Sequence, residues 1–142
     1  MLNEDAYRKA REEAERLPCP FGKAILARCC QCSLCVKRNI AEREVASCSD
    51  RTAQSACQVL LDLLLDKALF ALKHAQSEIP HAKAMKIQCG GLAGIAEVCG
   101  SSQDDVHALV LRALEKFGSL DDLPYSGIMK SIAAFEIRKR HQ

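Results

Sequence analysis

The sequence predicts an all-α protein, a single-domain bundle of about six helices, and two observations favour this fold. Aromatic residues make up only 4% of the 142 residues and tryptophan is absent. A composition rich in alanine and leucine favours closely packed helices over a barrel or sandwich built from aromatic and β-branched residues. Apolar residues also recur three and four positions apart, and we find no segment that alternates with a period of two.

The chain starts with a polar segment. A first helix is predicted over 4–17, with Asn3 as its N-cap and only a thin apolar stripe. Pro18 ends this helix, because proline cannot continue one. We therefore predict one domain, in which 1–17 is a peripheral polar helix and 18–142 is a cysteine-bearing helical core.

Four of the nine cysteines lie within residues 29–35. A second helix is predicted from 21 to about 41, and each residue advances ~100° around it. Cys30 then faces away from the core. The other three share the inward side: Cys29, Cys32 and Cys35. Arg28 also falls on that side, where it either reaches out to solvent or lies beside the thiolates as a counter-charge.

The third helix, from 51 to about 75, has the clearest apolar stripe. Cys57 opens that stripe, so we expect it to point inward near the level of Cys48. A fourth helix is predicted over 81–99, but it contains Gly90-Gly91, and each glycine weakens a helix by about 1 kcal/mol relative to alanine. Either the helix breaks there, or the glycines let another backbone come very close.

Two more helices are predicted over 106–117 and from about 126 to 140. Gly118 ends the first of them, as glycine commonly does. The basic run 138–140 closes the second, where cations complement the helix dipole. We therefore interpret this run as a helix end rather than a binding patch.

The cysteine spacing predicts the chemistry. Cys29-x2-Cys32-x2-Cys35 resembles the first three ligands of the iron–sulfur runs in bacterial ferredoxins. The resemblance covers seven residues, and no Cys-Pro follows them, so a further ligand must come from elsewhere in the fold. The predicted ligands of an iron–sulfur cluster are Cys29, Cys32, Cys35, Cys48, Cys57 and Cys89, with Cys19 as the substitute.

Gly90 and Gly91 are predicted to contribute to the cofactor site. In either arrangement of the fourth helix, they are expected to leave bare amides beside the sulfur of Cys89. Amides that donate to cluster sulfurs tune the potential. Tight helix packing is the alternative explanation of these two glycines.

Zinc and Cu(I) are the alternatives to iron and sulfide. Structural zinc prefers two paired sets of ligands, and Cys32-x2-Cys35 is one such pair without a second. The four histidines make no paired spacing, and His81 is the one outlying candidate. Cys29-Cys30-Gln31-Cys32 is similar to the Cys-Cys-x-Cys of copper chaperones of the mitochondrial intermembrane space, and soft thiolates suit Cu(I).

A disulfide framework is the remaining alternative. Cys19-x9-Cys29 and Cys89-x9-Cys99 share the spacing of twin Cys-x9-Cys helical hairpins, but Cys48-x8-Cys57 departs from it. The first residues are not a signal peptide, and residues 59–65 fall short of the ~20 apolar residues that span a membrane. We therefore expect a cytoplasmic protein, where reducing conditions favour free thiols or metal over disulfides.

The function predicted from these features is a cysteine-ligated iron–sulfur protein. It would act in electron transfer, in redox sensing or as an accessory subunit of a redox complex, with a protein redox partner. The alternatives are a zinc-stapled helical interaction module and a thiolate Cu(I)-binding protein. No catalytic motif is present, so we expect no catalytic activity of its own, and a net charge of +2 does not indicate nucleic-acid binding.

Overall fold

The computed structural model describes residues 4–6, 8, 17–72, 79–101 and 105–136. Most of this part of the chain is helical, and one antiparallel pair of strands accompanies the helices. In chain order the elements are α2 (Gly22–Leu26), β1 (Cys35–Ile40), β2 (Arg43–Cys48), α3 (Arg51–Leu72), α4 (His81–Cys99), α5 (Val106–Phe117), the 3-10 turn η2 (Leu120–Asp122) and α6 (Tyr125–Ala134). The chain is thus broadly helical, as predicted, but not purely all-α.

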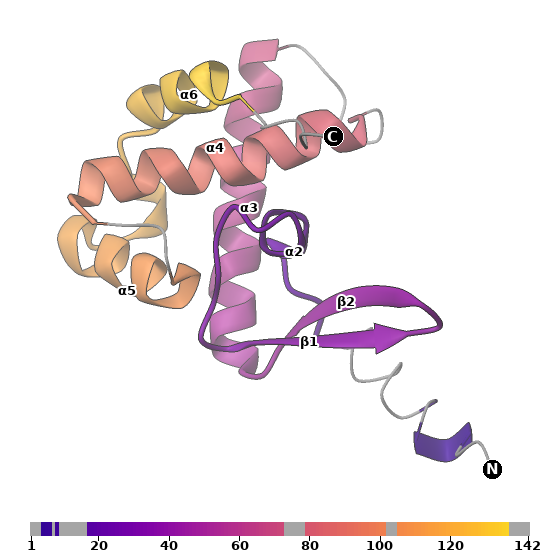
Figure 1. Cartoon of the computed structure of the whole chain (residues 1–142). Helices are drawn as coiled ribbons and strands as arrows, with labels where there is room; N and C mark the ends of the chain where they lie inside the picture. The colour runs from indigo at the N-terminus through magenta and orange to yellow at the C-terminus, as the bar shows by residue number, and fades with distance from the viewer. Residues whose placement is uncertain (1–3, 7, 9–16, 73–78, 102–104, 137–142) are drawn as a thin grey trace.

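Four helices enclose the apolar core. In Figure 1, α4 crosses α3, and α5 and α6 lie on opposite sides of α4. Each helix turns its apolar stripe inward, so that side chains from all four are fully buried, among them Leu64, Ile95, Leu109 and Ile128. The predicted bounds of α4 and α5 are confirmed. Helix α3 begins as predicted and is described to Leu72, and its predicted end lies outside the described residues.

Helix α4 continues unbroken through its glycines. A Cβ atom on Gly90 would lie 2.8 Å from the Cα of Ile132 in α6, and one on Gly91 would lie 2.8 Å from Cδ1 of Leu64 in α3. The glycines therefore permit close helix packing. Because amides inside a helix donate to carbonyls four residues earlier, the expectation of bare amides beside Cys89 is wrong.

The helix predicted over 21–41 is wrong beyond Leu26. Helix α2 ends there, and Arg28 adopts a left-handed backbone with φ of 65°. For a residue with a Cβ atom, that conformation costs on the order of 1–2 kcal/mol. The chain then runs through an irregular loop, 29–34, into the hairpin of β1 and β2, which extends away from the helices in Figure 1.

The hairpin was not predicted from the sequence, for two physical reasons. Val36 and Ile40 are four positions apart, a spacing that puts two residues on one face of a helix and also on one face of a strand. The two-residue turn is Ala41-Glu42, between the paired residues Ile40 and Arg43. Both turn residues have positive φ, 50° and 67°, whereas such turns usually contain asparagine or glycine.

The two ends of the chain are described only in part. Residues 4–6 and 8 are helical, as predicted, and the rest of the predicted first helix up to residue 16 lies outside the described residues. The last helix ends at Ala134, earlier than predicted, and the basic run 138–140 lies outside the described residues. None of the described helices has the length and apolar character needed to cross a membrane.

Candidate metal centre

The loop 29–34 carries three of the cysteines, and hydrogen bonds fix both of its flanks. The amide of Val106 donates to the carbonyl of Gln31 over 2.8 Å. The carbonyl of Leu34 accepts from the amide of Ser49 at 2.9 Å and from its hydroxyl at 2.8 Å. The loop is therefore tied to the start of α5 on one side and to the segment before α3 on the other.

Asp105 strengthens the tie to α5. Its carboxylate caps that helix by accepting from the amide of His107 at 3.1 Å, and it also accepts from the amide of Ser33 at 3.0 Å. Burial works against the charged form, but the hydrogen bonds from Ser33 and His107 outweigh it and lower the pKa of Asp105. An ionised aspartate thus holds the cysteine loop on the helical core.

The base of the hairpin brings three more cysteines together. Cys35 and Cys48 lie directly opposite each other in the strand register, and opposite residues project on the same face of a sheet. Cys19 joins them because its amide donates to the carbonyl of Ala46 in β2 over 3.1 Å. Cys57 is buried in α3 and interacts electrostatically with Cys48, so its predicted position is confirmed.

Eight of the nine thiols form one continuous network, in which each interacts electrostatically or by a hydrogen bond with at least one other. These eight are Cys19, Cys29, Cys30, Cys32, Cys35, Cys48, Cys57 and Cys89. Segments as distant as the loop before α2 and the middle of α4 contribute to it. Cys99 stands apart, buried in the core with Lys116 and Arg112 as its charged neighbours.

All six cysteines that the sequence analysis selected, and the substitute Cys19, belong to this network. Cys30 also belongs to the network but is not among the predicted ligands, because a helix would have turned it away from the core. Its side chain is in fact buried, with 5% of its surface exposed. The helical projection that turned Cys30 away from the core does not apply, because residues 29–34 form an irregular loop and not a helix. The density of four cysteines in seven residues was a sufficient signal to include Cys30.

Cys19 and Cys35 are hydrogen-bonded to each other through their sulfur atoms. The hydrogen bond from Cys19 lowers the pKa of Cys35 to about 7, with help from the ammonium of Lys37 and the amide of Ser47, against the effect of burial. The same hydrogen bond, together with burial, raises the pKa of Cys19 well above its ordinary value. Above about pH 7 the pair therefore keeps one proton, on Cys19, and Cys35 is the thiolate.

Four further thiols of the network have raised pKa values: those of Cys30, Cys32, Cys57 and Cys89. Burial raises the pKa of Cys30 and of Cys57 to about 12, with added repulsion from neighbouring thiolates. Burial also raises the pKa of Cys32, against amide hydrogen bonds from Leu34 and His107. Cys89 lies in hydrogen-bonding contact with Cys29, and burial followed by that contact raises its pKa.

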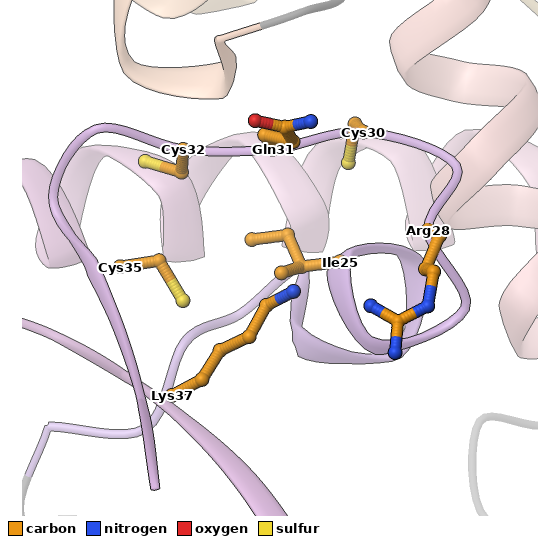
Figure 2. Close-up of a pocket in the computed structure, with 7 residues that line it drawn as sticks. All are labelled: Ile25, Arg28, Cys30, Gln31, Cys32, Cys35 and Lys37. Carbon is orange, nitrogen blue, oxygen red and sulfur yellow. The ribbon is translucent and has the colours of Figure 1, made fainter.

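A hollow of about 390 Å³ opens beside the loop. Its lining consists of Ile25, Arg28, Cys30, Gln31, Cys32, Cys35 and Lys37. Figure 2 shows the sulfurs of Cys30 and Cys35 turned towards this space, with the side chain of Lys37 extending into it. Arg28 also lines this hollow, and its side chain is exposed, in agreement with the first of the two positions expected for it.

The described ligand-type side chains do not form a closed metal site. Within that part of the chain, no three histidine, cysteine or carboxylate side chains make a group that could hold a metal ion. His81, the outlying histidine, is exposed, and its Nδ1 lies 2.9 Å from the Nζ of Lys23. A single zinc ion, with four ligands about 2.0–2.3 Å away, would require the thiols to draw together.

Comparison with known proteins gives no independent assignment. No family model matches the chain, and neither a curated protein nor a solved structure is significantly similar to it.

Proposed function

We propose that this chain is a cysteine-ligated iron–sulfur protein that acts in electron transfer, in redox sensing or as an accessory subunit of a redox complex. The observation that supports this proposal most is the network of eight thiols contributed by separate parts of the chain. Packing alone is a poor explanation for it, because a buried cysteine needs no sulfur neighbour to fill space. Cys99 illustrates that simpler case in the same core.

A cluster accepts a wider set of ligands than a single ion does. Iron and sulfide atoms separate the terminal thiolates of a cluster, so its ligands lie further apart than those around one zinc ion. A cluster would therefore suit thiols that come from separate elements of the chain better than one zinc ion would. Cys32, Cys35, Cys19 and Cys57 form a closed ring in which each thiol interacts with the next, and we propose these four as the first cluster ligands.

The surroundings of these thiols suit a redox centre. Amides of Leu34, His107 and Ser47 donate to the sulfurs of Cys32 and Cys35, and such hydrogen bonds tune the potential of a cluster. Lys37 adds positive charge near Cys35. The raised pKa values of Cys30 and Cys57 mean that binding a metal would release protons, since thiolates are the ligands.

The proposal is tested by anaerobic purification, followed by absorption and electron paramagnetic resonance spectroscopy and by iron, sulfide, zinc and copper analysis. We expect a coloured protein that contains iron and acid-labile sulfide. Cys32→Ser should lose most of the iron and the colour. Cys99→Ser is the matched control, because it removes a buried thiol outside the network, and it should retain both.

The alternatives predict different results in the same experiment. A colourless protein with stoichiometric zinc would support the zinc-stapled interaction module and sink the iron–sulfur proposal. Stoichiometric Cu(I) would support the copper-binding alternative, for which the contacting pairs Cys19–Cys35 and Cys29–Cys89 offer soft donors. Equal loss of iron in the Cys32 and Cys99 variants would also contradict the assignment of ligands.

A further inference from the structure

The hollow beside the cysteine loop carries two positive side chains. Arg28 follows α2 and Lys37 lies in β1, so the two approach the same space from different elements. Figure 2 shows them on different sides of Ile25. None of the described residues that line the hollow is acidic. With Cys35 as a thiolate, these residues carry two positive charges and one negative charge, so the described lining is positive on balance.

The two cations reach the hollow from defined backbone positions, and both side chains are exposed. Lys37 is two residues beyond Cys35 in β1, so the two side chains share one face of the hairpin. Arg28 adopts φ of 65° because it ends α2: the amides of Arg28 and Cys29 donate to the carbonyls of Ile25 and Ala24, the pairing of a Schellman motif. This helix end turns the chain into the cysteine loop and leaves Arg28 at the side of the hollow.

We propose that this hollow binds a small anionic molecule through a carboxylate or phosphate group held by Arg28 and Lys37. A guanidinium donates two parallel hydrogen bonds to either group, and an ammonium adds a point charge. The Gln31 amide offers a further donor, and Ile25 offers an apolar surface for the carbon part of a ligand. A volume of about 390 Å³ lies within the range of small-molecule sites, roughly 300–1,000 Å³.

The bound anion would lie against Cys30, Cys32 and Cys35, which line the same space. The site is thus placed where a ligand could influence the thiols, whatever metal they hold. The inference does not depend on the iron–sulfur proposal, because the two cations and the hollow belong to the protein itself. The rival explanation is that Arg28 and Lys37 only balance the charge of a bound centre.

The test is calorimetric titration of the full chain with sodium phosphate and, separately, with sodium succinate at constant ionic strength. It is carried out on the anaerobically purified protein and on the reduced, metal-free protein. We expect saturable one-to-one binding of at least one anion. Arg28→Gly combined with Lys37→Gln should weaken it roughly tenfold or more, as the loss of charged hydrogen bonds predicts.

Two features keep this test interpretable. Arg28→Gly suits the positive φ, and Lys37 is exposed, so the double variant should fold, which circular dichroism checks. Arg43→Gln is the matched control, because it removes the same charge from the same hairpin without touching the hollow, and binding should change less than about twofold. Binding of phosphate alone or of succinate alone identifies the anionic group and supports the proposal.

Two outcomes overturn the inference. One is the absence of saturable binding by either anion in both forms of the protein, and the other is equal affinity in the double variant. If, in the first case, the double variant also loses iron, that result would assign the cations to charge balance and leave the iron–sulfur proposal standing. Anion binding by a protein that takes up no iron or sulfide would support the anion site and contradict the iron–sulfur proposal.

Discussion

The helical region formed by α4, α5 and α6 is held together by apolar stripes and by close approaches of helix backbones. Cys99, the cysteine of this region that lies outside the thiol network, is an ordinary core residue. Residues 29–48 differ. Hydrogen bonds at Gln31, Ser33 and Leu34 hold an irregular loop, and a hairpin follows it whose second strand is bonded to residues 17–19. The cysteines concentrate in this second region. The difference indicates that one region stabilises the fold and the other presents thiols.

The largest expected effect tests the helical region. Gly90→Ala should lower the free energy of unfolding by about 1–3 kcal/mol, because its new Cβ meets the backbone of α6 and the strain outweighs the gain in helix propensity. Gly127→Ala is the control, since nothing lies within 4 Å of a Cβ there. That change should raise stability by about 0.5–1 kcal/mol. Urea denaturation of the metal-free protein measures both, and equal effects would contradict the described packing.

The next prediction concerns the thiol-bearing region. Only a thiolate reacts with iodoacetamide, so the alkylation rate of Cys35 should rise with pH around a midpoint near 7 in the reduced, metal-free protein. Removing the hydrogen bond in Cys19→Ala should move this midpoint upward, and Lys37→Gln should move it upward by less. Peptide mass spectrometry follows the reaction, with Cys99→Ser as the control that leaves the midpoint unchanged. A midpoint at the ordinary value of 9.0 would contradict the Cys19–Cys35 pair.

The smallest expected effect concerns the hairpin turn. Ala41→Asn combined with Glu42→Gly should stabilise the protein by about 1 kcal/mol, because both positions have positive φ. Glu44→Gly, inside β2, should instead destabilise it by about 0.5–1 kcal/mol. Thermal unfolding compares the variants. A double variant less stable than the parent protein would indicate that this segment is not the described hairpin.

Much of the helical region was predictable from sequence because its signals are local. The stripe that includes Leu60 and Leu64 has helical period, and Gly118 ends a helix by its conformational freedom. The hairpin was not predictable in the same way. Its turn lacks glycine and asparagine, and the spacing of Val36 and Ile40 is compatible with both periods. The error at Cys30 followed directly from that misassignment.

The sequence by itself determined that this chain is largely helical and that its cysteines are unusually dense, because both properties depend on residues close together in the chain. Tertiary structure alone decided which thiols become neighbours. Cys19, Cys57 and Cys89 reach the loop only through the packing of β2, α3 and α4 around it. Tertiary structure also decided that Arg28 and Lys37 line the same hollow. Contacts between distant segments follow from the path of the backbone, which local periodicity does not specify.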